Sequence, residues 1–206
     1  MSFQNNKEKI SYIIGRDMAA NFKKQGIEID ADFLLRVLKE ALTGTQSKLS
    51  QDEVQDAMME LQQLMQSRQA GAHSRIAEIN KEEGEAFLAE NKNREGVITL
   101  PSGLQYMVLR EGTGATPGKT DKVTTHYHGT LIDGTVFDSS YERGQPATFP
   151  VNGVISGWTE ALTKMKEGAK WRLFLPSNLA YGAQGAGDDI GPNATLIFDV
   201  ELISVN

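Results

Sequence analysis

The sequence predicts an α+β protein, with an all-α N-terminal region and a C-terminal antiparallel β-sheet wrapped on one short helix. Two observations lead to this prediction. All six prolines and fourteen of the twenty glycines follow residue 100, so the earlier region is typical of helices and the later one of strands joined by turns. Within the later region only one short segment has the apolar spacing of a helix, which favours a single helix packed on a sheet.

The N-terminal region predicts two short helices. The first covers about residues 7–24, where Ile10, Ile14, Met18 and Phe22 recur every four positions. The second covers about residues 32–43 and is capped by Asp30 or Asp32. Two helices alone bury too little apolar surface to be stable. They therefore pack against the third helix of the same chain, against a second copy of the protein, or against both.

The third helix begins at the capping box Ser50-Gln51-Asp52-Glu53, and no proline interrupts it before Pro101. Its apolar stripe thins after Gln66, and a helix that is polar nearly all round often bridges solvent between domains. Gly71 and Gly84 are expected to bend or fray this helix, or to be tolerated on a solvated face.

We expect three regions: a helical dimerisation domain over 1–65, a long linker helix over 66–95 that continues from about residue 50, and a β-rich domain over 96–206. Two interpretations remain for the methionines Met58, Met59 and Met65. They pack in a core, or they form an adaptable surface for unfolded proteins.

Composition excludes several classes of function. The net charge of −6 and the sequence pI of about 5.2 argue against nucleic-acid binding. The chain has no cysteine, so disulfides and a cysteine nucleophile are excluded. No apolar run approaches the length of a membrane span, and the N-terminus lacks the apolar core of a secretory signal. We therefore expect a cytoplasmic protein that does not bind membranes.

The C-terminal region predicts about five strands. Leu104 to Val108 alternates as a strand, and a second strand begins at Val123. Asp133-Gly134 predicts a hairpin with a primed turn, leading to a strand that ends at Phe137-Asp138. A short helix over 159–166 and strands over 170–175 and 195–205 complete this region.

The segment from Val123 to Trp158 predicts a pocket. It gathers Tyr127, Phe137 and Trp158 with one carboxylate, Asp138, which favours a site that binds by desolvation. The alternatives are that the aromatic residues are ordinary core and that Asp138 caps a turn. His126 and His128 lie on one face of a strand, but no third metal ligand is apparent, so we expect no metal site.

These residues carry a resemblance to a known family. Residues 101–206 resemble the catalytic domain of the FK506-binding-protein (FKBP) class of peptidyl-prolyl cis-trans isomerases. The matching segments are SGLQYMVLREGTG, VTTHYHGTLIDGTVFDSS, FPVNGVISGWTEAL, MKEGAKWRLFLPSNLAYG and NATLIFDVEL. The three N-terminal helices resemble the dimeric, bacterial subfamily similar to the macrophage infectivity potentiator, whose long helix holds the catalytic domain away from the dimer interface.

The resemblance implies a set of site residues and no cofactor or metal. The catalytic group comprises Asp138, Tyr181, Phe137, Trp158 and Phe198, and the substrate-binding group comprises Tyr127, Arg143, Val154, Ile155 and Ile190. Trp158 is expected under the proline ring, Asp138 at the mouth with Arg143 beside it, and the Ile155 amide and Tyr181 hydroxyl on the substrate main chain. The sequence departs from the family pattern at Ala147, Ala186 and Gly191.

The implied reaction is rotation about an Xaa-Pro amide, which makes and breaks no covalent bond. Two hypotheses follow. In the first, a homodimeric isomerase, joined through its N-terminal helices, accelerates the folding of proline-containing peptides and unfolded proteins and binds macrolides of the FK506 type. In the second, the protein is a folding chaperone or scaffold, and its pocket only holds prolines.

Overall fold

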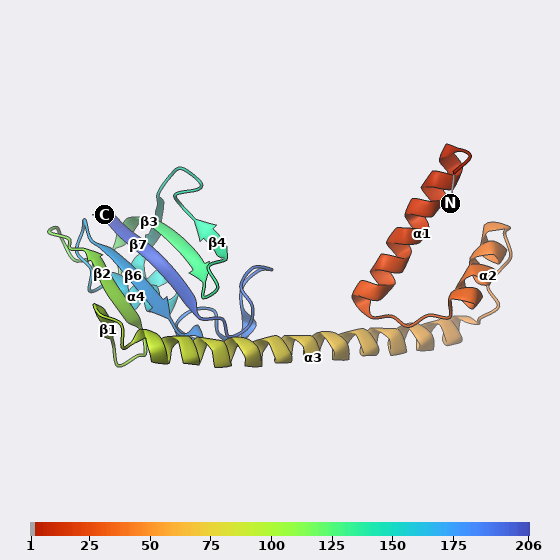
Figure 1. The fold of residues 1–206 in the computed structure, drawn as a ribbon, viewed down its shortest axis with the longest axis horizontal. Coiled ribbons are helices and arrows are strands. Elements are labelled where there is room, and N and C mark those ends of the chain that lie inside the picture. Colours follow the sequence, from red (N-terminus) through yellow and green to blue (C-terminus); the bar gives the residue numbers. More distant parts are fainter. Residues whose placement is uncertain (1–2) are drawn as a thin grey trace. The chain divides into compact units, whose positions relative to one another are not determined.

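The computed structural model describes residues 3–206 and divides into two compact units on either side of the Ala70–Gly71 bond. The helices are α1 (Asn6–Gln25), α2 (Ala31–Leu42), α3 (Gln51–Asn91) and α4 (Ser156–Leu162). The strands are β1 (Val97–Thr99), β2 (Gln105–Arg110), β3 (Lys122–Leu131), β4 (Val136–Ser139), β5 (Ala147–Pro150), β6 (Lys170–Leu175) and β7 (Leu196–Val205) (Figure 1). Short 3₁₀ turns follow β5, as η1 (Val151–Gly153), and β6, as η2 (Ser177–Leu179) and η3 (Gly182–Gln184).

The helices of the first unit begin and end where their capping residues predict. Asp30, rather than Asp32, caps α2 by accepting a hydrogen bond of 2.9 Å from the Phe33 amide. The predicted capping box of α3 is confirmed, because the Glu53 carboxylate accepts from the Ser50 amide at 2.8 Å while the Ser50 hydroxyl accepts from the Glu53 amide. Neither α1 nor α2 has a buried residue.

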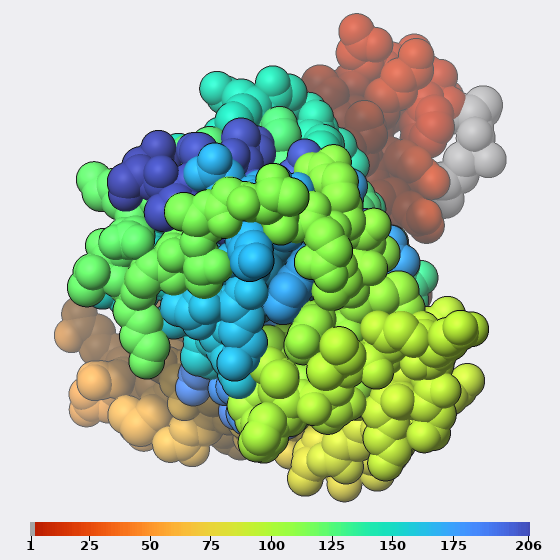
Figure 2. All heavy atoms as spheres, turned by 90° about the vertical axis from the view of Figure 1, so that its left-hand side faces the viewer, coloured from red at the N-terminus to blue at the C-terminus, as the bar shows by residue number. Residues whose placement is uncertain are grey.

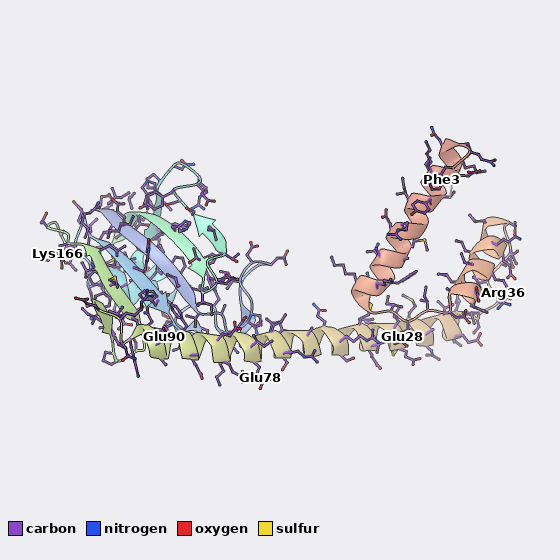
Figure 3. All side chains as sticks on the ribbon, in the orientation of Figure 1. Phe3, Glu28, Arg36, Glu78, Glu90 and Lys166 are labelled. Carbon is purple, nitrogen blue, oxygen red and sulfur yellow. The ribbon has the colours of Figure 1, made fainter. Side chains whose placement is uncertain are left out.

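Helix α3 is continuous over 41 residues, and neither Gly71 nor Gly84 interrupts it. Its last part belongs to the second unit, where Glu78 and Glu90 mark its course in Figure 3. The ring of Phe87 lies 5.9 Å from that of Phe174, and the Gln105 side-chain amide donates to the Leu88 carbonyl at 2.9 Å. These contacts join the end of α3 to the sheet, so the boundary between the units falls inside the helix and not near residue 96.

The second unit is the predicted antiparallel sheet with one short helix. The strand order is β1-β2-β6-β7-β3-β4, and β5 pairs with the first half of β3, on the same edge as β4 and opposite β7. In Figure 2 the yellow-green residues at the end of α3 lie at the lower right, and blue residues show between the green segments. Strand β1 pairs with β2 at the edge of the sheet. The expected five strands become seven, because the short strands β1 and β5 have too few residues to show a strand pattern in the sequence.

The hairpin between β3 and β4 forms, but its turn is not primed. The Gly134 amide donates to the Leu131 carbonyl at 3.1 Å, and Gly134 has a φ of +88°. Asp133 keeps a negative φ, since Asn193 is the one non-glycine residue in 3–206 with a positive φ. This pattern is a type I turn followed by a left-handed glycine.

Helix α4 packs against the core residues of the sheet. It runs over Ser156–Leu162, starting and ending a few residues before the predicted 159–166, and it buries Trp158, Ala161 and Leu162. These side chains join a single core with Leu173 and Val200 from the central strands. Trp158, near the start of this helix, also lines the cavity described next.

Candidate functional site

A cavity of about 530 Å³ opens in the second unit. It is bounded by β3, β4, β5 and β7, by the start of α4, and by the segment after η2, which we call the pocket loop (residues 181–193). The lining residues are Tyr127, Phe137, Asp138, Phe149, Gly153, Val154, Ile155, Trp158, Tyr181, Ala186, Gly187, Asp189, Ile190 and Phe198.

Aromatic rings form the floor and two walls. The ring of Trp158, which is 4% exposed, lies edge-on to those of Tyr127, Phe149 and Phe198 at centroid distances of 5.3, 5.5 and 5.2 Å. Phe137 and Phe198 meet edge-to-face at 5.4 Å. Edge-to-face pairs of this kind hold each other in fixed orientations, so the apolar surface of the cavity is preformed.

A glycine in β3 makes room for these rings. A Cβ atom at Gly129 would lie 2.7 Å from the ring of Phe137 and 2.8 Å from that of Phe198. The two phenylalanines therefore pack directly against the bare backbone of β3. Any side chain at position 129 would push them into the cavity.

One corner of the cavity is polar. The Tyr127 hydroxyl donates a hydrogen bond of 2.6 Å to Asp138 Oδ2 and accepts one of 2.7 Å from the Arg143 guanidinium. Arg143 also donates to Asp138 Oδ1 and lies over the ring of Tyr127, 5.4 Å from its centroid. Burial, and then the hydrogen bond to Asp138, raise the pKa of Tyr127. The phenol therefore stays protonated and orients the carboxylate.

Nine of the ten residues expected in the site line the cavity, and Arg143 contacts two of them. Their roles toward a substrate stay predictions. Asp138 does not cap a turn, since its side chain bonds to Tyr127 and Arg143. Trp171 stacks on Tyr106 at 4.3 Å and belongs to the core.

Sequence reasoning missed Phe149, Gly153, Gly187 and Asp189 as lining residues. Phe149 lies on β5, a strand of four residues that pairs with β3 and is too short for its alternation to be recognised in the sequence. Ala147, noted as a departure from the family pattern, is not among the lining residues, and Phe149 supplies an aromatic ring two positions later.

The two histidines of β3 are held by serine hydroxyls. His126 Nδ1 lies 2.9 Å from Ser140 Oγ, and its ring stacks on Tyr141. His128 Nδ1 lies 3.1 Å from Ser139 Oγ. Within residues 3–206, His, Asp and Glu side chains do not gather in the groups of three that a metal ion requires.

Comparison with known proteins assigns the family. A model described as FKBP-type peptidyl-prolyl cis-trans isomerase matches residues 114–203, and one described as the domain amino terminal to FKBP-type peptidyl-prolyl isomerase matches residues 7–108. The chain belongs to the FKBP-type peptidyl-prolyl cis-trans isomerases. The predicted fold class and enzyme activity are thereby confirmed.

The relatives of this FKBP-type isomerase are similar over its whole length. Outer membrane protein MIP of Legionella longbeachae is 48% identical over 99% of this chain and 88% of its own length. Peptidyl-prolyl cis-trans isomerase Mip of Coxiella burnetii is 45% identical over 97% of this chain and 86% of its own length. The crystal structure of FkpA from Escherichia coli superposes with a TM-score of 0.83 at 38% identity, covering 100% of this chain and 99% of that one. The likeness of the N-terminal region to that of FkpA is consistent with dimerisation.

The expectation of a cytoplasmic location is wrong. The Legionella longbeachae relative, which is 48% identical to this chain, is by name an outer membrane protein. None of the helices in residues 3–206 combines the length and the apolar character that a membrane span requires. The charge and the pocket carry no information on location, because rotation about an amide proceeds equally well in either compartment.

Proposed function

We propose that this isomerase acts as a homodimer at the cell envelope, where each cavity binds an Xaa-Pro segment of a folding protein. The cavity carries this proposal: aromatic rings surround it, and Asp138 at its polar corner is held by Tyr127 and Arg143. Rotation about the amide has a barrier of about 18–20 kcal/mol, because it breaks amide resonance. The cavity must therefore bind the rotated amide better than the planar one.

The apolar walls favour the rotated amide. An amide twisted out of its plane has less charge separation than a planar one, so a site that excludes water stabilises it relative to the ground state. We assign Trp158 to the floor beneath the proline ring, and Phe137 and Phe198 to the adjoining wall. The edge-to-face contacts of these rings support this assignment, because they fix the cavity before the substrate binds.

The polar groups hold the peptide while its bond turns. We assign the Ile155 amide and the Tyr181 hydroxyl to the substrate main chain, Val154 and Ile190 to the flanking side chains, and Asp138 to the rotating carbonyl. Tyr181 is 40% exposed at the rim of the cavity, where a bound peptide would reach its hydroxyl. Such contacts convert binding energy into orientation of the reacting bond.

A cis-to-trans assay on a short Xaa-Pro peptide tests this assignment. We expect Asp138→Ala and Tyr181→Phe to lower kcat/KM. Tyr141→Phe is the matched control, because Tyr141 is 41% exposed, close to the 40% of Tyr181, and its hydroxyl bonds to Glu201 outside the cavity. Equal rates for the Tyr181 and Tyr141 variants would contradict the role of Tyr181.

Exposed apolar side chains on the first unit support the homodimer. Ile10, Ile13 and Ile14 on α1 are 57, 56 and 54% exposed, and Leu42 on α2 is 80% exposed. Isolated helices with this much exposed apolar surface are not stable in water. We propose that the N-terminal helices of a second copy cover it.

Sedimentation equilibrium tests the dimer. We expect twice the chain mass of 22.6 kDa. Ile14→Glu should return the mass to that of one chain, whereas Arg16→Glu should not, because two residues along a helix correspond to about 200° of rotation. A single-chain mass for the unaltered protein would refute the homodimer.

Client binding by the first unit is the second candidate function. Met58 and Met59 are 60 and 50% exposed, in a groove with Gln55 and Gln62, which favours an adaptable surface over core packing in one chain. A client whose refolding has no proline-limited step separates the two functions. If Asp138→Ala loses peptide isomerisation but still raises the refolding yield of that client, the chaperone function is separate from the pocket.

A further inference from the structure

The pocket loop has two sides with different partners. One side supplies Tyr181, Ala186, Gly187, Asp189 and Ile190 to the cavity. The other side faces α3, in the stretch around Glu78 that Figure 3 labels. The loop is thus the wall between the cavity and the helix.

Side-chain hydrogen bonds join the loop to the helix. Asn80 Nδ2 donates to the Pro192 carbonyl at 2.8 Å, and Asn193 Nδ2 donates to the Ala77 carbonyl at 3.2 Å. Both bonds are partly buried, and they run in opposite directions between the two segments. Together they fix the end of the loop against one turn of α3.

A glycine lets the two segments approach closely. A Cβ atom at Gly191 would lie 2.9 Å from Asn80 Nδ2 and 3.5 Å from Ile76 Cγ2. Gly191 is also a position where the sequence departs from the pattern of its family. Helix α3 therefore occupies the space that a side chain at position 191 would need.

Backbone hydrogen bonds within the pocket loop connect its attached end to the residues that line the cavity. The amides of Ala186 and Ile190 each donate to the carbonyl of the other, at 2.8 and 3.1 Å. The Asn193 amide donates to the Gly182 carbonyl at 2.8 Å, next to Tyr181. A shift of Asn193 relative to α3 would consequently move Tyr181 and Ile190.

We propose that Asn80 and Asn193 are positioning residues for the isomerase reaction, which make the second half of α3 part of the substrate pocket. They hold the pocket loop in its binding conformation before the substrate arrives, so binding does not have to order it. This role rests on the proposed function, which assigns Tyr181 and Ile190 to the bound peptide. It also gives α3 a task beyond linking the two units.

The test uses the full-length protein with Asn80→Ala and Asn193→Gly. Glycine at 193 keeps the left-handed backbone, where Asn193 has a φ of 56°, and removes only the amide side chain. Glu82→Ala, at an exposed position of the same helix, is the matched control. From the usual contribution of one hydrogen bond, we expect KM for an Xaa-Pro peptide to rise about three- to ten-fold in both variants. We expect little change in kcat, and no change in either constant for the control.

Three outcomes would overturn the proposal, and they are distinguishable. If both variants unfold more easily but keep the KM of the unaltered protein under folding conditions, the contact is only structural. Tyr181→Phe and Ile190→Ala test the underlying assignment. If they raise KM while the asparagine variants do not, the site stands and the positioning role fails. If they leave KM unchanged, Tyr181 and Ile190 do not contact the substrate, and the positioning role fails with the assignment.

Discussion

The hydroxyl oxygen of Tyr127 lies 2.6 Å from Asp138 Oδ2, on the polar corner of the cavity. Because Arg143 donates to the same hydroxyl at 2.7 Å, the phenol acts as a bridge between a carboxylate and a guanidinium. Arg143 also bonds to Asp138 directly, so the carboxylate has two restraints. Asp138 is therefore oriented before substrate binds.

Tyr127→Phe removes one of those restraints and keeps the aromatic wall. We expect a loss of about 1 kcal/mol of unfolding free energy, the usual contribution of a hydrogen bond, and a fall of about three- to ten-fold in kcat/KM. Urea denaturation and the peptide assay measure the two effects. An unchanged kcat/KM would mean that the orientation of Asp138 does not limit the reaction.

Gly129→Ala places a methyl group against the rings of Phe137 and Phe198. Overpacking of this kind costs about 1–3 kcal/mol and forces side chains out of their rotamers. We expect a higher KM for an Xaa-Pro peptide, measured in the cis-to-trans assay, together with reduced stability. If stability falls and KM does not rise, the two rings do not form the binding wall.

The same substitution at two glycines of α3 should have opposite effects. A Cβ atom at Gly71 meets no atom within 4 Å, so Gly71→Ala should add about 0.5–1 kcal/mol through helix propensity. A Cβ atom at Gly84 would lie 2.3 Å from Thr195 Oγ1, so Gly84→Ala should cost about 1–3 kcal/mol. Denaturation followed by tryptophan fluorescence reports on the second unit, which holds Trp158 and Trp171. Equal signs for the two variants would contradict the packing of α3 on Thr195.

Acid should weaken the sheet through Glu201. The hydrogen bond from Arg110, 2.6 Å long, holds the pKa of Glu201 below its usual value of 4.5. A carboxyl group with a lowered folded-state pKa stabilises the fold above the unfolded value, and this stabilisation is lost as the pH falls through the lower, folded-state value. Stability should therefore decline as the pH drops below about 4.5. Glu201→Gln should flatten that decline, measured by denaturant midpoints at a series of pH values; a slope identical to that of the unaltered protein would refute the assignment.

Local patterns predicted the elements with strong signals. The capping box at Ser50, the alternation after Val123 and the family motifs located α3, β3 and most of the cavity. The short strands β1 and β5 carry too few residues for a period to be recognised. Phe149 was missed for that reason, although it lies on the cavity.

Contacts between distant residues were beyond sequence reasoning. The local sequence indicates only that Gly84 weakens a helix. Position 84 has no room for a side chain because Thr195, more than a hundred positions later in the chain, packs against it. The bonds of Asn80 and Asn193 likewise join segments that no local pattern relates. The prediction of a cytoplasmic location was wrong for a different reason. None of the residues that form the pocket depends on the compartment in which the protein works.

In the proposed homodimer, the lack of buried residues among positions 3–70 makes the stability of the helical unit depend on protein concentration, whereas the stability of the second unit does not. Where a second copy supplies the core, dilution unfolds the helices by mass action, whereas a unit with its own core unfolds at a temperature that dilution does not change. Calorimetry at several protein concentrations should therefore show two transitions, of which only the helical one moves. The catalytic unit would survive dilution as an active monomer while the helices that pair it with a second copy had already unfolded.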